Sequence, residues 1–249
     1  MSEQFSICEI FSSIQGEGML AGRRQIFVRL SGCNLVCRYC DTDHAESTIC
    51  RIESKPGSGH FIERPQPFSC EKLAAVIADW QAQLPGAHHS ISFTGGEPLL
   101  QADSLAQCFP VIHRLIPVHL ETNGTLITAL TRVIAHVDFI SMDMKLPSTS
   151  GCAETLWESH RLFLEQSRGS NVSVKIVAGE STDFKEINKV CDIIDAVDLT
   201  TPLFLQPLTL PNGSPGISAS RILRLQELAS SRLPDVRVIP QMHKLLGIL

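Results

Sequence analysis

The sequence has no apolar run of 18 residues or more, so we expect no membrane-spanning helix. Its first residues, MSEQFSICEIF, have neither a basic segment nor a long apolar segment, and so do not resemble a secretory signal. No charge of one sign dominates, because the net charge of the 249 residues is −5. This balance argues against a nucleic-acid or anionic-membrane surface. We therefore expect a soluble cytoplasmic protein that binds neither nucleic acid nor membrane.

Cysteine, in contrast, is well represented, with nine residues. The number is odd, and a chain of this length can bury a core without disulfide bonds. Cys33, Cys37 and Cys40 fall within eight residues, which is typical of metal ligands in a reducing compartment. We expect the other six to be small buried apolar residues. They are Cys8, Cys50, Cys70, Cys108, Cys152 and Cys191.

Short apolar strands alternate about six times with amphipathic helices. This alternation predicts parallel βαβ units, arranged as an open doubly wound sheet or as a full or partial barrel. We find no tandem repeat and no low-complexity tract, so residues 1–249 are expected to form one domain, and the Pro- and Gly-containing segment 45–68 an irregular insertion. The expected strands are 5–11, 25–30, 89–94, 118–122, 137–144, 172–177, 201–205 and 236–239; the expected helices are 69–84, 103–115, 128–135, 152–166, 182–194 and 218–230.

The cysteine run reads Cys33-Asn-Leu-Val-Cys37-Arg-Tyr-Cys40. Three thiolates in one loop can bind three irons of a [4Fe–4S] cubane and leave the fourth iron without a protein ligand. The amino and carboxylate groups of S-adenosylmethionine could chelate that open iron, and an electron passed to the sulfonium would release a 5′-deoxyadenosyl radical. A Cys₃His zinc site completed by His44 is the alternative.

Polar groups and glycines follow several of the expected strands, where ligands bind in α/β proteins. Glu97, in Thr94-Gly95-Gly96-Glu97-Pro98, could accept from the ammonium group of S-adenosylmethionine. Glu121 and Asn123 could bind its ribose or amino acid part, although Asn123-Gly124 also suits a plain turn. Arg29 could hold a substrate carboxylate or simply face solvent. Lys175 lies in an apolar strand, where an unpaired lysine is rarely buried.

The Cys-x₃-Cys-x₂-Cys spacing, with Tyr39 before the third cysteine, and the Gly-Gly-Glu-Pro segment resemble the radical S-adenosylmethionine enzymes. Four further segments resemble the 7-carboxy-7-deazaguanine synthase family, and together the resemblance spans most of the chain outside residues 45–68. These segments are Phe11-Ser-Ser-Ile-Gln-Gly-Glu-Gly18, Phe27-Val-Arg-Leu-Ser-Gly-Cys33-Asn-Leu, Cys40-Asp-Thr-Asp43 and Pro240-Gln-Met-His-Lys-Leu-Leu-Gly.

The resemblance implies a partial (βα)₆ TIM-like barrel and a carbon–nitrogen lyase. Such an enzyme contracts the ring of 6-carboxy-5,6,7,8-tetrahydropterin to 7-carboxy-7-deazaguanine with loss of ammonia, in queuosine and deazapurine biosynthesis. It further implies a [4Fe–4S] cluster, S-adenosylmethionine and Mg²⁺ as cofactors, a homodimer, and flavodoxin or ferredoxin as electron donor.

With the strand-end contacts above, the resemblance assigns the site residues as follows. Cluster ligands are Cys33, Cys37 and Cys40, and Thr42 binds Mg²⁺. S-adenosylmethionine contacts Tyr39, Asp41, Gly96, Glu97, Glu121, Asn123, Asp143, Met144, Lys145, Gln206, Pro207, Leu208 and Thr209. Substrate contacts Ile14, Gln15, Gly16, Glu17, Arg29 and Thr94.

The chain departs from the family at two places. Asp143-Met144-Lys145 stands where Ser-Pro-Lys is expected, and the chain continues past any C-terminal proline that could offer its carboxylate to substrate. A glycyl-radical activase is the alternative within the superfamily, and a non-enzymatic zinc-binding protein the alternative outside it. The Gln-Gly-Glu-Gly and Cys-Asp-Thr segments favour the pterin substrate. His44 receives no role.

Overall fold

A ten-stranded sheet with the strand order β12-β11-β10-β9-β8-β7-β3-β2-β4-β5 organises the chain. The structure is a computed structural model and describes residues 4–43, 45, 47–153 and 156–249. The strands are β1 (Gln4–Phe5), β2 (Ile7–Ile14), β3 (Arg24–Leu30), β4 (Ile49–Glu53), β5 (Phe61–Pro65), β6 (Phe68–Ser69), β7 (Ser90–Gly95), β8 (Val118–Thr122), β9 (Phe139–Asp143), β10 (Asn171–Ala178), β11 (Leu203–Pro207) and β12 (Val236–Val238).

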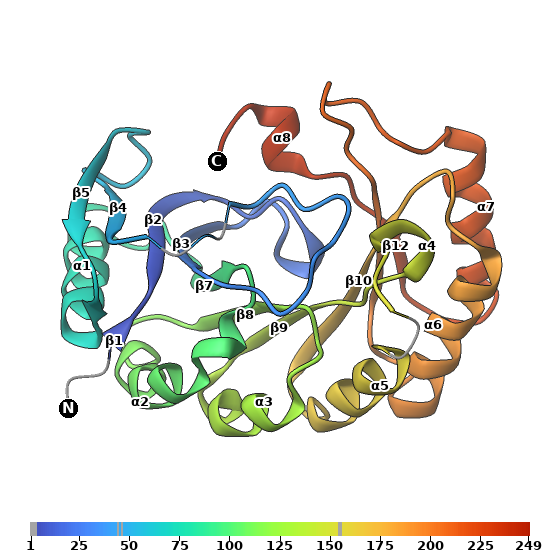
Figure 1. Ribbon diagram of the computed structural model, residues 1–249, viewed down its shortest axis with the longest axis horizontal. Coiled ribbons are helices and arrows are strands. Elements are labelled where there is room, and N and C mark those ends of the chain that lie inside the picture. The colour runs from blue at the N-terminus through green and yellow to red at the C-terminus, as the bar shows by residue number, and fades with distance from the viewer. Residues whose placement is uncertain (1–3, 44, 46, 154–155) are drawn as a thin grey trace.

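The helices are α1 (Cys70–Gln83), α2 (Ala102–Ile112), α3 (Ile127–Val133), α4 (Pro147–Ser150), α5 (Leu156–Gln166), α6 (Phe184–Val197), α7 (Ala219–Ser230) and α8 (Met242–Leu246), with short 3₁₀ turns η1 (Gly18–Leu20), η2 (Pro98–Gln101) and η3 (Ile134–His136). From β7 onward helices alternate with the strands, and α2, α3, α5 and α6 pack outside the curved sheet (Figure 1).

Strands β3 and β7 to β12 run parallel, and each of β7 to β11 is followed by a helix that returns to the amino end of the sheet. After β3, the strands β4, β5 and β6 come before the returning helix α1. The sheet stays open, because β12 lies at one edge and β5 at the other. The predicted partial (βα)₆ barrel is confirmed.

Helix α1 shows how the sequence produces these units. The Ser69 hydroxyl accepts from Lys72 N at 3.3 Å, which caps the first turn. Leu73, Ile77 and Trp80 then recur at helical spacing and are buried against the sheet. The remaining helix positions are mostly exposed, so the helix covers the sheet with one apolar stripe.

The segment 45–68 was predicted to be irregular, and this prediction is wrong. It contains the hairpin β4–β5, and β4 pairs in parallel with β2, so the hairpin extends the main sheet. The buried Glu53 carboxylate organises the turn, since it accepts from Gly57 N at 2.8 Å, Gly59 N at 2.6 Å and Ser12 N at 2.9 Å.

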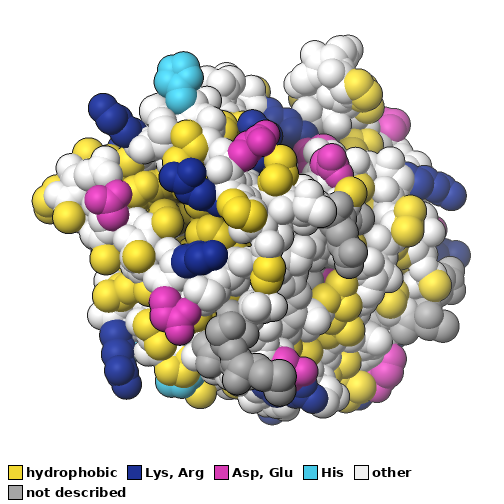
Figure 2. Space-filling model, turned by 60° about the vertical axis from the view of Figure 1, so that its left-hand side comes forward, with side chains coloured by type: hydrophobic (Ala, Val, Ile, Leu, Met, Phe, Trp, Pro, Cys, Tyr) yellow, Lys and Arg dark blue, Asp and Glu magenta, His cyan; other side chains and the backbone are white. Residues whose placement is uncertain are grey.

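On the face shown in Figure 2, basic, acidic and hydrophobic side chains are interspersed.

Cysteines outside the motif also depart from expectation. Cys50 and Cys191 are buried and free, as expected, but Cys70 and Cys108 form a disulfide between α1 and α2. Cys8 and Cys152 are only half-buried. Within the described residues, no helix is long and apolar enough to cross a membrane.

Candidate active site

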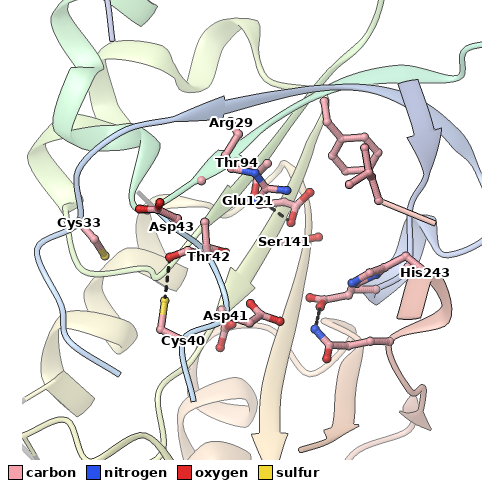
Figure 3. Close-up of a pocket in the computed structure, with 18 of the residues that line it drawn as sticks. Arg29, Cys33, Cys40, Asp41, Thr42, Asp43, Thr94, Glu121, Ser141 and His243 are labelled. Carbon is pink, nitrogen blue, oxygen red and sulfur yellow. Dashed lines mark hydrogen bonds between the residues drawn. The ribbon is translucent and has the colours of Figure 1, made fainter. Parts of the chain in front are cut away.

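A cavity of about 670 Å³ opens at the carboxyl ends of the parallel strands. Its wall is formed by the connection after β2, the cysteine loop after β3, the ends of β7 to β11, and the C-terminal segment with α8. Helix α8 lies on the opposite side of the sheet from α2 and α3 (Figure 1). Residues far apart in the sequence therefore share one cavity, and Figure 3 shows several of them.

All three cysteines of the loop line this cavity. Burial raises the pKa of the Cys37 thiol to about 12. A metal centre reverses such a shift, because a coordinated thiol is deprotonated outright. Among the described residues, no three His, Cys, Asp or Glu side chains are arranged around one common ion. A cubane does not need such convergence, because each thiolate binds a different iron. The loop fits a [4Fe–4S] cluster; His44 of the zinc alternative lies outside the described residues.

The Gly95-Gly96 turn lies directly against the base of the cysteine loop. Gly96 N donates to Leu30 O at 3.2 Å, and a Cβ on Gly96 would come within 1.9 Å of Gly32 O. Gly95 has a φ of +125°, which disfavours any other residue. The two glycines therefore leave a bare backbone edge beside the cluster ligands, where a cofactor can approach closely.

Glu97 does not line the cavity, so the structure gives no support to its expected contact with S-adenosylmethionine. The side chain is fully buried and accepts from Leu99 N at 3.0 Å, the Thr122 hydroxyl at 2.8 Å and Asn123 N at 2.7 Å. Burial raises the pKa of Glu97 to about 7, although these hydrogen bonds oppose the shift. Glu97 instead joins the ends of β7 and β8.

Met144 and Pro207 also fail to line the cavity. The Met144 side chain is fully buried in the apolar core, so a contact between it and the cofactor is excluded by this geometry. Asn123 does line the cavity, and its amide donates to the Asn34 side chain at 2.8 Å while its oxygen closes the expected turn at Thr125. All the other assigned site residues line the cavity: Ile14, Gln15, Gly16, Glu17, Arg29, Tyr39, Asp41, Thr42, Thr94, Gly96, Glu121, Asp143, Lys145, Gln206, Leu208 and Thr209.

A network of four buried charges crosses the cavity floor. Lys175 Nζ contacts a Glu17 oxygen and lies 2.9 Å from Asp143 Oδ2, which also pairs with Lys145 Nζ at 2.9 Å. Lys145 in turn lies over the Tyr39 ring, 5.3 Å from its centroid. Sequence reasoning left the direction of Lys175 open; it points into the barrel and is paired.

In this network, the effect of ion pairing on the pKa values outweighs the effect of burial. Burial alone would raise the pKa of Glu17 and of Asp143, but the adjacent lysines lower both. The pKa values of Lys145 and Lys175 are raised in turn, mainly by Asp143, against the effect of burial. All four groups are therefore charged at neutral pH. Asp143 Oδ1 is buried and has no hydrogen-bond partner among the described residues, while Asp143 as a residue lines the cavity.

Glu121 forms the centre of a second polar cluster. Gln15 Nε2 donates to its Oε1 at 2.9 Å, and the hydroxyls of Ser92 and Thr94 donate to the same carboxylate. Gln15 is itself held by Gln25 at 2.9 Å. These donors fix the Glu121 carboxylate at the cavity wall, where Figure 3 shows it beside Thr94.

Arg29 also lines the cavity, so the solvent-facing alternative is wrong. Its Nε donates to Glu9 Oε1 at 2.8 Å, and the guanidinium lies over the Phe11 ring, 5.4 Å from the centroid. Arg51 approaches the other Glu9 oxygen at 3.7 Å. Arg51 comes from β4, in the segment predicted to be irregular, so no sequence signal placed it at the site.

The C-terminal segment closes one side of the cavity and was not assigned any site residue from the sequence. Gln241 Nε2 donates to Glu17 at 2.8 Å, Met242 N donates to Gly16 O at 3.1 Å, and Lys244 pairs with Asp41. Burial would raise the pKa of Asp41, but the Lys244 hydrogen bond and charge lower it. The resemblance around Pro240 was the signal that could have pointed to this segment.

Comparisons with known proteins agree with this geometry. Residues 27–154 match the family model described as the radical SAM superfamily. The 7-carboxy-7-deazaguanine synthase of Geobacter sulfurreducens is 50% identical over 97% of this chain and 96% of its own length. The synthase of Methanothermobacter thermautotrophicus is 34% identical over 97% of both chains. The crystal structure of QueE from Escherichia coli superposes with a TM-score of 0.65 at 22% identity, covering 96% of this chain and 94% of that one.

Proposed function

Because the chain belongs to the 7-carboxy-7-deazaguanine synthase family of the radical SAM superfamily, we propose that it carries out this synthase reaction. The substrate would be 6-carboxy-5,6,7,8-tetrahydropterin and the product 7-carboxy-7-deazaguanine, with release of ammonia. The chain is a radical S-adenosylmethionine enzyme that uses a [4Fe–4S] cluster, a small-molecule substrate and a reductant. The family resemblance seen in the sequence is confirmed.

One observation carries the proposal: a single cavity is lined by the three cluster cysteines on one wall and by Gln15, Arg29 and Glu121 on another. A cofactor bound at the cysteines would therefore share one cavity with a ligand held by an arginine and by a carboxylate that an amide fixes in place. When bound, the cluster and S-adenosylmethionine supply one-electron and hydrogen-abstraction chemistry. The protein supplies position and keeps water from the reacting atoms.

On the cofactor side, Asp143 and Lys145 present one acceptor and one cation. The Asp143 carboxylate, which lines the cavity, would accept a hydrogen bond from the amino group or a ribose hydroxyl of S-adenosylmethionine. The Lys145 ammonium would pair with its carboxylate. The bare backbone at Gly96 and the polar end of β11 at Gln206 complete this wall.

On the substrate side, the groups match a carboxylated pterin. Arg29 keeps guanidinium N–H groups beyond the one bound to Glu9, and these would hold the carboxylate. The Glu121 carboxylate would accept from N–H groups of the pterin ring, and Gln15, whose amide hydrogens are bound to Gln25 and Glu121, would hold that carboxylate in place. Since Gln15, Ser92 and Thr94 already fix Glu121, its oxygen needs little reorganisation on binding.

Thr42 would provide the magnesium site. Its side chain lines the cavity between the cysteine loop and the substrate wall, and Asp41 and Asp43 flank it in the sequence (Figure 3). Mg²⁺ prefers hard oxygen ligands and keeps several waters, so one hydroxyl together with substrate oxygens suits it. The ion would orient the substrate carboxylate and polarise it.

The wider setting is part of the same proposal. The enzyme would act in the cytoplasm on the route to queuosine and related deazapurines, as a homodimer reduced by flavodoxin or ferredoxin. The reducing compartment suits a half-exposed three-cysteine loop. We also propose that residues 1–249 act as one domain, which is supported by a single main sheet and one continuous apolar core.

An anaerobic assay tests the reaction. The reconstituted chain is mixed with carboxytetrahydropterin, S-adenosylmethionine, Mg²⁺ and a reductant, and product and 5′-deoxyadenosine are measured by mass spectrometry. We expect both to form together. Cofactor cleavage that the pterin does not stimulate, with no deazaguanine product, would contradict the proposed substrate. The activase alternative predicts instead a glycyl radical on a partner protein, detected by electron paramagnetic resonance.

A further inference from the structure

Cys152 is a half-buried cysteine outside the cluster motif, and its sulfur lies 3.7 Å from that of Cys37. All seven free cysteines belong to the described part of the chain, and among them only this pair has sulfurs within hydrogen-bonding distance. Cys33 Sγ accepts from Leu35 N at 3.5 Å, and Cys40 Sγ contacts Thr42 O at 3.8 Å. One cluster ligand thus faces a fourth thiol, whereas the other two face backbone groups.

The fold holds Cys152 in this position through Ser150. Arg38 N, next to Cys37, donates to Ser150 O at 2.9 Å, and Cys152 N donates to Ser150 Oγ at 3.1 Å. Ser150 is fully buried, and its hydroxyl donates to Leu146 O at 2.7 Å. These hydrogen bonds hold the cluster loop against the end of α4 on either side of the two thiols. The packing of these two segments therefore fixes the short distance between the sulfurs.

Gly151 shows how close the two segments are. It adopts a left-handed conformation with φ +74°, and a Cβ placed on it would lie 2.7 Å from Arg38 Nε. The chain therefore turns directly beneath the cluster loop, immediately before Cys152. A larger residue at this position would be strained by the positive φ and would displace the Arg38 side chain.

We propose that Cys37 and Cys152 form a reversible disulfide when an oxidant such as hydrogen peroxide reaches a chain that carries no cluster, and that this bond controls cluster loading. With hydrogen peroxide as the oxidant, two S–H bonds break and one S–S bond forms. The two electrons and two protons pass to the peroxide, which becomes two water molecules. A dithiol reductant reverses the step by donating its two thiol hydrogens and becoming a disulfide itself.

The geometry makes this reaction accessible. The sulfurs must approach by about 1.7 Å to reach a bond length of about 2.05 Å. Cys37 lines the open cavity, so a small oxidant can reach it once the iron is gone. The bond removes one of the three cluster ligands and protects its thiol from further, irreversible oxidation. The oxidised chain would therefore be unable to hold the cluster until a dithiol restores Cys37.

Peptide mapping of the full chain tests the bond itself. The cluster is removed anaerobically with a chelator, one equivalent of hydrogen peroxide is added, free thiols are alkylated, and the chain is digested with trypsin. Cleavage after Arg29, Arg38, Lys145 and Arg161 places Cys37 in peptide 30–38 and Cys152 in peptide 146–161. We expect these two peptides to be linked, with fragmentation assigning the bond to Cys37, and the link to disappear after dithiol treatment. A link from Cys37 to Cys33 or Cys40 instead, or no link at all, would overturn the proposal.

Iron loading tests the consequence. After peroxide treatment, the wild-type chain should take up iron and sulfide only after dithiol treatment, whereas Cys152→Ser and Cys152→Ala should load without it. Cys191→Ser, which changes a buried thiol in α6, is the control and should behave like the wild type. Circular dichroism checks that each variant is folded. If both Cys152 variants fold and still require the dithiol, Cys152 does not control loading. Neither readout depends on the pterin substrate.

Discussion

Lys175 on β10 contacts Glu17, which lies 158 residues earlier in the chain, across the interior of the barrel. The same ammonium group lies 2.9 Å from Asp143 on the neighbouring strand β9. One lysine thus joins a residue assigned to the substrate wall with a residue assigned to the cofactor wall. Both carboxylates are charged because of this lysine and Lys145, so the shape and charge of the cavity floor depend on them.

Lys175→Met should therefore destabilise the protein and weaken S-adenosylmethionine binding. The substitution leaves Glu17 without its cation and Asp143 with only Lys145, and leaving a buried charge unpaired costs roughly 3–5 kcal/mol. Urea unfolding of the cluster-free chain measures the first effect and calorimetric titration the second. Lys185→Met, at an exposed position of α6, is the control and should change neither. Wild-type stability of Lys175→Met would show that the pair contributes little.

Cys37→Ala should abolish the cluster. Two remaining thiolates cannot hold three irons of a cubane, so iron content and visible absorption after anaerobic reconstitution should fall to background. Cys8→Ala removes a half-buried thiol that lines the same cavity outside the motif, and it should retain the full iron content. Equal iron in both variants would refute the assigned ligand.

Thr42→Ala should leave the cluster and S-adenosylmethionine binding intact but raise the Mg²⁺ concentration needed for half-maximal turnover. Residues that only hydrogen-bond to metal ligands already contribute roughly 10–100-fold to metal affinity. Loss of a ligand itself should therefore raise the required Mg²⁺ concentration by roughly tenfold or more. Thr42→Ser keeps the hydroxyl and should restore the wild-type response. A Mg²⁺ profile unchanged in Thr42→Ala would remove this residue from the metal site.

Arg29→Ala should raise the KM for the pterin without changing cofactor affinity. A charge-assisted hydrogen bond contributes about 2 kcal/mol, which corresponds to roughly 30-fold in KM. Arg51→Ala is the matched comparison, since Arg51 also approaches Glu9 but is more exposed, and its effect should be smaller. If Arg29→Ala weakens S-adenosylmethionine binding as much as substrate binding, the assigned role is incorrect.

Glu97 gives the protein a pH-dependent stability term. Its folded pKa of about 7 lies above the ordinary value of 4.5, so the folded state holds a proton that the unfolded state releases. The resulting stabilisation is complete below about pH 4.5 and is lost as pH rises to about 7, and the full difference amounts to about 3 kcal/mol. Glu97→Gln imitates the protonated form.

Urea unfolding of wild type and Glu97→Gln at several pH values between 5 and 8 isolates this contribution, because the other titrating groups are common to both chains. The difference in unfolding free energy should shift in favour of the glutamine variant as pH rises. S-adenosylmethionine affinity should be unchanged, since Glu97 does not line the cavity. A parallel pH dependence in the two chains would show that Glu97 is ionised throughout.

Local sequence was sufficient to predict the parallel α/β architecture and the cysteine loop, whereas most of the cavity lining was assigned through the family resemblance. Strand periodicity and the Ser69 cap depend on neighbouring residues, and the carboxyl ends of parallel strands must meet at one edge. Spacing alone brings Cys33, Cys37 and Cys40 into one loop. The hairpin β4–β5 was missed because its pairing with β2 depends on Glu53 and Ser12, which lie 41 residues apart.

Tertiary structure decided which polar groups serve the cavity and which serve the fold. Glu97 follows β7 and Lys175 lies within β10. Donors from Leu99 and from the distant Thr122 and Asn123 hold Glu97 in the core, while two carboxylates pair with Lys175 inside the barrel. A buried charge is tolerated only where an oppositely charged partner is present. The sequence of one strand does not reveal whether another strand supplies that partner. The same holds for Cys152, whose nearness to Cys37 arises only when α4 packs beneath the cluster loop.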